Sequence, residues 1–323
     1  MDIVTPLSSI DNYEELVKVG ADEFYCGVVP NEWLTNFNNS MPLNRREYML
    51  SCNISTLSSM EILKRKIDKY KVPVKITLNS HFYNKDQYGI LMNYIKTLMK
   101  IGFSTFIIAD ISLIIYLRQS GIDCNIHLSS EVSEINSEVI AFFEQFDISR
   151  YIFTRKNSIE DIRQCTKNCK TNAEFEAFIL NELCAYTGSF CNTIHCDEME
   201  NMCKVPYKIV LQNSDSEKFQ KVNRALNLIN KVRISDIKIS HDDDYKLGNT
   251  GCGICKIKEL DMAGVTHLKV VGRNKELKYL KEDIRNVKAI INSMKDYEDY
   301  SLFAKEIKEK YMSNQCPTSC YYI

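Results

Sequence analysis

The sequence has no long apolar segment. No run approaches the roughly 18 uninterrupted apolar residues that a membrane-spanning helix needs. The first residues, MDIVTPLSSIDNYEEL, also lack the basic start and apolar core of a signal peptide. We therefore expect a cytoplasmic protein without a membrane span.

An excess of charge of either sign is also absent. The chain has 41 Lys plus Arg residues against 42 Asp plus Glu residues, a formal net charge of -1. Such a balance gives no overall attraction to polyphosphate or to an anionic membrane. Nucleic acid is not indicated as a partner, although a local basic patch would be enough to bind RNA.

Several catalytic motifs are missing. The sequence contains neither the Gly-x-Ser-x-Gly elbow of serine hydrolases nor the His-Glu-x-x-His helix of zinc peptidases. No glycine-rich phosphate loop follows the first expected strand, which argues against an open dinucleotide-binding sheet. A cysteine peptidase with Cys26 as nucleophile and His127 as base remains an alternative.

Short β-rich runs alternate with amphipathic helical segments. Helices are expected at 58–70, 87–102, 112–121 and 137–146, and several end in a glycine that suits a left-handed cap. Strands that alternate with helices pair in parallel, and eight of them favour a closed (β/α)8 TIM-type barrel. The expected strands are 3–6, 23–28, 74–79, 105–110, 125–129, 151–155, 174–180 and 267–272.

Two connections are longer than the others. Residues 29–57 follow the second expected strand, and residues 181 to about 250 follow the seventh. Both begin where strands end, so both are expected over the carboxyl-terminal face of the barrel, where active sites form. We divide the chain into a barrel at 1–274, with a cluster-binding excursion at 181–252, and closing helices with a tail at 275–323.

The chain contains 13 cysteines. Cytoplasmic thiols stay reduced, so metal binding or redox chemistry is a more natural role for them than disulfide formation. The spacings from Cys184 to Cys191, Cys203 and Cys252 are 6, 11 and 48 intervening residues. Iron–sulfur clusters accept four such dispersed thiolates, whereas structural zinc prefers tight pairs such as Cys252 and Cys255. A cluster, a zinc site and unligated thiols all remain open on spacing.

A series of motifs resembles peptidase family U32. GADEFYCGV at 20–28 resembles the family's Gly-Ala-Asp-x-x-Tyr-x-Gly element, and the stretch at 126–162 resembles its His-x-Ser, Asn-Ser and Arg run. FEAFILNELCAYTGSFC, CKVPY and CGICKIKELDMAGVTHLKVVGR follow in the family's order. The resemblance covers most of residues 1–273.

This resemblance implies a cofactor and a chemistry. Several family members bind a 4Fe-4S cluster, and some act in oxygen-independent hydroxylation of ubiquinone precursors or RNA bases. The matching ligand positions here are Cys184, Cys191, Cys203 and Cys252, with Cys255 as an alternate fourth ligand. Other members carry a protease or collagenase label, and some work as pairs.

Polar residues at strand ends are further candidates for the active site. Arg155 and Arg273 end two expected strands, from which a guanidinium can clamp a carboxylate or phosphate, or form a structural ion pair. Glu176 lies within a strand and is expected to need an arginine partner. His127 faces either the barrel interior, as a catalytic or core histidine, or the helices.

Asn79 and Asp110 also stand at strand ends, where they suit a ligand site or a loop cap equally well. Two cysteine pairs remain open as metal ligands or as isolated thiols: Cys165 with Cys169, and Cys316 with Cys320.

The function predicted from these features is an iron–sulfur enzyme that hydroxylates, or modifies in a related way, a small molecule, peptide or RNA base. By analogy with the family, a small organic acid donates the oxygen, and an arginine at the mouth binds its carboxylate. The alternatives are a peptidase and a non-catalytic subunit whose cluster serves a protein partner or electron donor.

Overall fold

The computed structural model describes residues 1–37, 42–48, 50–184, 188–191, 195–196, 200–201, 220–221, 224, 245–312, 316 and 319–322. The account below concerns these residues. The predicted ligand Cys203 lies outside them.

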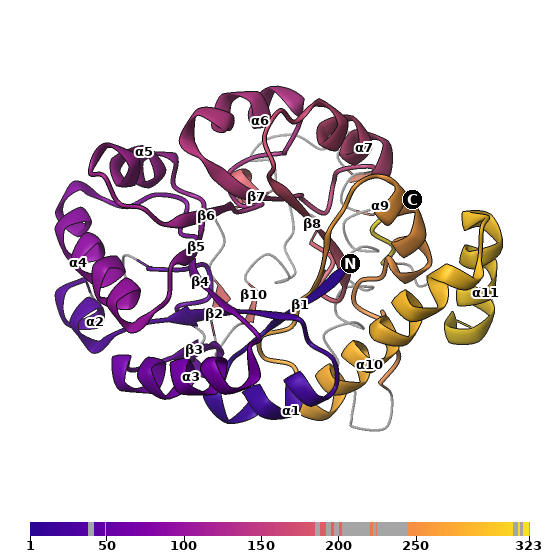
Figure 1. Cartoon of the computed structure of the whole chain (residues 1–323), viewed down its shortest axis with the longest axis horizontal. Helices are drawn as coiled ribbons and strands as arrows, with labels where there is room; N and C mark the ends of the chain where they lie inside the picture. Colours follow the sequence, from indigo (N-terminus) through magenta and orange to yellow (C-terminus); the bar gives the residue numbers. More distant parts are fainter. Residues whose placement is uncertain are drawn as a thin grey trace.

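Eight parallel strands close into a barrel, with β1 pairing to both β11 and β2 (Figure 1). A short ninth strand, β3 (Asn53–Ile54), extends β2 in the connection that follows it. The TIM-type barrel that the alternating pattern predicts is therefore confirmed. The barrel strands, in chain order, are β1 (Asp2–Pro6), β2 (Glu23–Val28), β4 (Val74–Leu78), β5 (Thr105–Ile108), β6 (Asn125–Leu128), β7 (Ile148–Ile152), β8 (Glu174–Leu180) and β11 (His267–Val270).

Helices surround the barrel and bury the outer faces of its strands (Figure 1). The bounds of the four expected helices agree to within three residues with those of α3, α4, α5 and α6, where α6 is taken together with the short helical turn at 144–146. None of the helices in the described ranges is both long enough and apolar enough to span a membrane. The helices are α1 (Tyr13–Lys18), α2 (Asn31–Phe37), α3 (Leu57–Tyr70), α4 (Lys85–Ile101), α5 (Ile111–Gln119), α6 (Ser137–Phe143), α7 (Ile159–Asn168), α9 (Ile257–Met262), α10 (Leu277–Ser293) and α11 (Tyr300–Met312).

Glycines end several of these units as expected. Gly102 caps α4 with a φ of 113°, and Gly20, Gly121 and Gly264 also have positive φ. A residue with a Cβ resists this left-handed backbone, so glycine lets the chain turn sharply from each helix into the next strand.

One predicted strand was wrong in its position. The sixth barrel strand covers Ile148–Ile152, whereas 151–155 was expected. Arg150 lies in the middle of this strand and points into the barrel, where buried carboxylates surround it. A charged residue normally signals the end of a strand, and the partners that make Arg150 acceptable here come from distant parts of the sequence.

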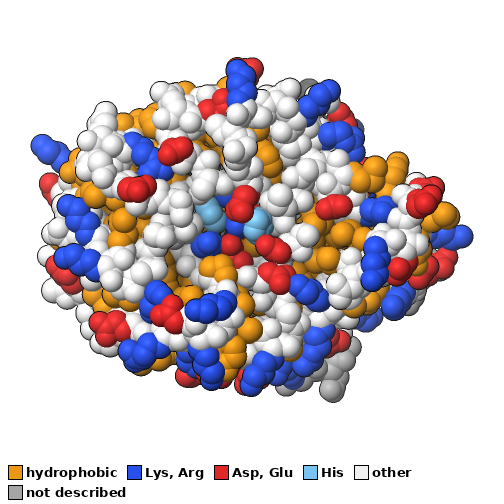
Figure 2. Space-filling model, viewed as in Figure 1, with side chains coloured by type: hydrophobic (Ala, Val, Ile, Leu, Met, Phe, Trp, Pro, Cys, Tyr) orange, Lys and Arg blue, Asp and Glu red, His pale blue; other side chains and the backbone are white. Residues whose placement is uncertain are grey.

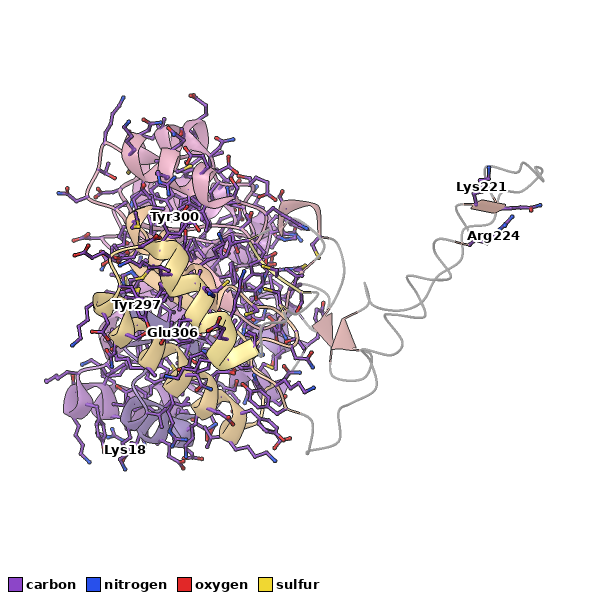
Figure 3. The ribbon with its side chains drawn as sticks, turned by 90° about the vertical axis from the view of Figure 1, so that its right-hand side faces the viewer. Lys18, Lys221, Arg224, Tyr297, Tyr300 and Glu306 are labelled. Atoms are coloured by element: carbon purple, nitrogen blue, oxygen red, sulfur yellow. The ribbon has the colours of Figure 1, made fainter. Side chains whose placement is uncertain are left out.

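The closing helices complete the barrel beside β1. α10 packs on β1 and α1, and α11 packs on α9 and on the turn at 254–256. Figure 3 shows Tyr300 and Glu306 on α11. Glu306 accepts a hydrogen bond from Tyr297, which precedes α11, and this bond contributes most to raising the pKa of the Tyr297 phenol to about 12. A pair β9 (His195–Cys196) and β10 (Glu200–Asn201) forms a two-stranded sheet of its own in the excursion.

Candidate functional site at the carboxyl ends of the barrel strands

The barrel interior carries charged side chains where many barrels have aliphatic ones. Arg150 contacts Glu23 Oε1 at 2.6 Å, Glu176 Oε2 at 2.9 Å and Glu174 Oε2 at 2.7 Å. Lys269 Nζ lies 2.5 Å from Glu176 Oε1. Figure 2 shows histidine, acidic and basic side chains gathered at the centre of the face on which Figure 1 marks the N-terminus, and Glu23 and Glu174 are the first residues of β2 and β8. This network therefore lies toward the amino-terminal end of the barrel.

Glu176 therefore has the arginine partner that its burial requires. Its side chain is fully buried, and burial alone would raise its pKa. The charges of Lys269 and Arg150 outweigh burial and hold the pKa of this carboxyl well below its usual range. Both carboxylate oxygens of Glu176 are engaged in these ion pairs, so neither is available for catalysis.

His127 also faces the barrel interior and is only 3% exposed. Burial, followed by the charges of Arg150 and Lys75, lowers the pKa of this imidazole well below its ordinary value. Its Nδ1 atom has no hydrogen-bond partner within the described residues. The imidazole is therefore neutral at physiological pH.

Glu23, His127 and Glu176 offer three ligand-type atoms within 4.8 Å of one another. Both carboxylates are already paired with Arg150, and Glu176 is paired with Lys269 as well. A divalent cation would have to enter a space that these cations already dominate. We therefore interpret this group as an ion-pair network.

Cys26 and His127 lie on opposite sides of the sheet. Cys26 faces the helices, where its charge influences Tyr94 of α4, whereas His127 faces the interior beside Glu23. Burial raises the pKa of the Cys26 thiol to about 12. A cysteine peptidase built on this pair is not supported.

The carboxyl-terminal mouth of the barrel is lined by arginines, and two of them were missed by sequence reasoning. Arg45 and Arg46 come from the long connection after β2, which was expected over this face. Arg46 pairs with Glu182 after β8, and Arg45 Nε lies 3.6 Å from Glu131 after β6. The only sequence signal was the Asn-Arg-Arg-Glu run in a loop of predicted position.

Arg273 follows β11 and is 8% exposed. Its Nη1 donates to Asn44 Oδ1 at 3.2 Å, and its guanidinium lies 5.8 Å from the ring centre of Tyr25. Gly27 makes this arrangement possible, because a Cβ there would lie 2.1 Å from Asn53 Oδ1 and 3.2 Å from Arg273 Nη1. Among the described residues, no carboxylate lies within ion-pair distance of Arg273.

Arg155 lies three residues after the end of β7, is half-buried, and has its guanidinium carbon 3.9 Å from the ring centre of Phe178. Tyr321 hydrogen-bonds to Arg155, and the Nε atom of Arg155 is buried without a partner in the described part of the chain.

Burial of Arg273, aided by the nearby charge of Arg46, lowers the pKa of the Arg273 guanidinium. Neither Arg155 nor Arg273 is paired with a carboxylate among the described residues. Their positive charges are therefore available to bind an anion.

Cys184 and Cys191 lie at this mouth. The Arg45 guanidinium donates to Cys191 Sγ at 3.2 Å, and Cys184 is close enough to Arg155 to act on its charge. Gly188, between the two cysteines, packs so closely on the end of β6 that a Cβ would lie 2.4 Å from the Ser130 carbonyl oxygen. This contact fixes the cysteine loop against the barrel.

Cys252 lies on the segment that returns to the barrel from the excursion. It pairs as an isolated antiparallel bridge with Leu180, and Leu183 N–H donates to the Thr250 carbonyl. The segment carrying Cys252 is thereby placed alongside the one leading to Cys184. Cys252 and Cys255 are both buried.

The other two polar candidates have structural contacts. Asp110 caps α5 by accepting from Ser112 N–H, and it also accepts from Tyr83 N–H and the Tyr88 hydroxyl. Asn79 accepts from Arg45 N–H at 3.3 Å and so helps to position the arginine loop. Asp110 acts as a loop cap here, one of the two roles expected of it.

A family model described as Peptidase family U32 matches residues 8–322. The chain belongs to peptidase family U32. Membership of the family explains why the sequence motifs occur in the family's order. In this U32 chain they lie on a TIM-type barrel.

Two curated proteins illustrate the range of names among relatives of this U32 chain. It is 25% identical to the tRNA hydroxylation protein P1 of Bacillus subtilis over 190 residues, 58% of this chain and 40% of that protein. It is 24% identical to a collagenase of Porphyromonas gingivalis over 163 residues, 50% of this chain and 35% of that protein. The chain spans less than half the length of either relative.

A solved structure of a U32 peptidase is also similar. It shares 9% sequence identity with this chain at a TM-score of 0.46, covering 84% of this chain and 93% of that one.

The donor chemistry of the mouth fits an iron–sulfur cluster. Cysteine thiolates are the usual ligands of such clusters, and hydrogen bonds to their sulfurs tune the reduction potential. Cys184 and Cys191 supply two thiols, and Arg45 donates one such hydrogen bond to Cys191. Cys203 was the third predicted ligand.

Proposed function

We propose that this U32 chain is an iron–sulfur enzyme that hydroxylates, or modifies in a related way, an RNA base, peptide or small molecule without dioxygen. Cys184, Cys191 and Cys203 hold the cluster at the barrel mouth, and Cys252 is the predicted fourth ligand. The name of the Bacillus relative, a tRNA hydroxylation protein, supports this chemistry.

The observation that carries the proposal is a pair of guanidinium groups beside the cysteine loop, one buried and one half-buried, that have no carboxylate partner among the described residues. Arg273 and Arg155 face the mouth from β11 and β7. Arginine matches the planar geometry of a carboxylate or phosphate with two parallel hydrogen bonds. These two residues bind the anionic group of the substrate or of an organic acid that donates oxygen.

The chain's own residues supply position and charge. Arg45 holds the Cys191 sulfur by a hydrogen bond, while Asn44 and Asn53 hold the Arg273 loop in place. When bound, a cluster of this type supplies electrons at low potential. The ring of Phe178 beneath Arg155 keeps water from one side of that guanidinium.

The test is metal analysis after anaerobic purification of the wild type and of a Cys184→Ala/Cys191→Ala variant. We expect a brown wild type with about four irons and four sulfides per chain, as a thiolate-held cubane requires, and their loss in the variant. Cys169→Ala is the matched control, since this half-buried thiol lies at the end of α7. A colourless wild type after anaerobic reconstitution would contradict the proposal.

A further inference from the structure

The tail of the chain returns to the barrel and brings two tyrosines to its carboxyl-terminal end. We call residues 319–322 the tail segment. Its backbone pairs with the segment that carries Cys252: Cys252 N–H donates to the Ser319 carbonyl at 3.0 Å, and Tyr321 N–H donates to the Cys252 carbonyl at 2.9 Å. Tyr321 and Tyr322 are only 6% and 7% exposed. Both side chains are therefore enclosed by the folded protein.

Two glycines make room for the two tyrosine rings. A Cβ on Gly251 would lie 2.7 Å from the Tyr321 hydroxyl oxygen and 2.8 Å from the Asn181 carbonyl oxygen. A Cβ on Gly253 would lie 2.8 Å from Cε2 of Tyr322. These distances are shorter than van der Waals contact, so glycine at both positions lets the tail segment approach this closely.

The Tyr321 hydroxyl lies between the end of β8 and the Arg155 side chain. It donates to the carbonyl of Asn181, which follows β8, and it accepts a hydrogen bond from the Arg155 guanidinium. A hydroxyl group has one proton and two lone pairs, so it can make both hydrogen bonds at once. Tyr321 thus holds one side of a guanidinium whose Nε atom has no partner within the described residues.

The Tyr321 phenol stays neutral in this position. Burial raises the pKa of the phenol by more than the charge of Arg155 lowers it. A carboxylate in the same place would form an ion pair and offset the charge of the guanidinium. A neutral oxygen orients Arg155 and leaves its positive charge available to an anion.

Tyr322 supports the strand whose aromatic ring lies against Arg155. The Tyr322 hydroxyl donates to the Phe178 carbonyl at 2.8 Å, and the Phe178 ring centre lies 3.9 Å from the guanidinium carbon of Arg155. The two tyrosines are therefore similarly buried, and each donates to one backbone carbonyl. Among the contacts of the described residues, only Tyr321 of the two also hydrogen-bonds to Arg155.

We infer, on the basis of the proposed function, that Tyr321 is a positioning residue of the anion site: it holds the Arg155 guanidinium in the orientation that binds the anionic group of the substrate or organic acid. Tyr321 acts through Arg155 and needs no contact with the substrate. The tail segment is in consequence part of the site at the barrel mouth.

Anion affinity, measured on the full chain, tests this role. Calorimetric titrations with malonate and with inorganic phosphate cover the two kinds of anion that a guanidinium binds. We expect Tyr321→Phe to weaken the affinity for the bound anion by about tenfold, since Arg155 loses a hydrogen bond that orients it. Tyr322→Phe, the matched control, should bind the anion as the wild type does.

Stability measurements separate positioning from packing. Each substitution leaves a backbone carbonyl without its hydroxyl donor, so urea unfolding should show a similar loss of stability in both variants. Only Tyr321→Phe should also lose affinity. In a double-mutant cycle, Tyr321→Phe should have no further effect on the residual affinity of Arg155→Gln, to which Arg273 contributes.

Iron content measured on the same samples reports on the proposed function separately. Tyr321-dependent anion binding by a protein that holds no iron would support the role of Tyr321 and contradict the cluster. An iron-bearing Tyr321→Phe variant with wild-type affinity would support the cluster and contradict the role of Tyr321.

Three results would overturn the inference. A wild type that binds neither anion would remove the site itself. Wild-type affinity in Tyr321→Phe would remove the tyrosine from that site. An equal loss of affinity in Tyr321→Phe and Tyr322→Phe would assign the tail segment a packing role alone.

Discussion

At the scale of single residues, the barrel interior places an imidazole among positive charges. His127 faces Arg150, Lys75, Lys269 and His267, and the nearby carboxylates Glu23 and Glu176 are engaged by those cations. Protonation would add a further positive charge to a buried space, which is unfavourable. The folded protein therefore keeps His127 neutral where the unfolded chain would bind a proton.

A pH dependence of stability follows for His127. Its folded pKa lies below the unfolded value, so its contribution is fully present above about pH 6.5 and is lost as the pH falls below that value. The free energy of unfolding should fall by up to about 1.4 kcal/mol per pH unit from this residue. Urea titrations of the wild type and of His127→Gln at pH 7.5 and 5.5 measure how much of the pH dependence of the unfolding free energy the substitution removes. Identical slopes in the two proteins would mean that folding does not shift the pKa of His127, which would contradict the prediction.

At the scale of elements, polar strand ends serve to connect one βα unit with the next. Asp110 lies two residues after β5, caps α5 and accepts from the buried Tyr83 N–H at 2.9 Å. Asn136 caps α6 by accepting from Val139 N–H at 2.9 Å, and its side chain makes no additional hydrogen bond to the part of the chain that the structure describes. A comparison of the two caps therefore separates the effect of helix capping on the free energy of unfolding from the effect of the additional tertiary hydrogen bonds.

We expect Asp110→Ala to destabilise the fold by about 2 to 4 kcal/mol, the sum of a lost cap and an unpaired buried amide. Asn136→Ala, the matched control, should lose only about 1 kcal/mol. Thermal or urea unfolding of both variants provides the comparison. If Asp110→Ala folds with wild-type stability but is inactive, the catalytic role predicted for Asp110 gains support instead.

At the scale of the whole molecule, Arg150 connects β7 with its neighbour β8 and with β2, which is not its neighbour. It extends from β7 to Glu23 on β2, across the interior of the barrel, and also binds Glu176 on β8. Three strands thus share one buried cation. Removing it would leave carboxylates buried without a compensating charge.

Arg150→Met should therefore lower the free energy of unfolding by about 3 to 5 kcal/mol. Arg163→Ala, which removes an exposed ion pair with Glu160 on α7, should change it by less than about 0.5 kcal/mol. Urea unfolding at pH 7 distinguishes the two. Adding Glu23→Gln and Glu176→Gln to Arg150→Met should restore part of the loss, and a loss unaffected by these additions would mean that Arg150 acts by packing.

The barrel could be predicted from the sequence, because apolar periodicity and glycines at the ends of helices are local signals that need no tertiary information. It also indicated that the two long connections cover the carboxyl-terminal face, and Arg45 and Arg46 of the first connection do reach that mouth. The U32 membership likewise follows from the order of the motifs.

Which charged side chains meet could be seen only once the chain was folded. Arg150 was placed outside its strand because its carboxylate partners lie 24, 26 and 127 residues away in the sequence. Motif order grouped Cys252 with Cys184, and the fold places Cys252 beside Leu180, which lies four residues before Cys184, and also beside Cys320 of the tail. Pairing across such separations depends on how the barrel closes and where the tail returns, and no local pattern in the sequence encodes either.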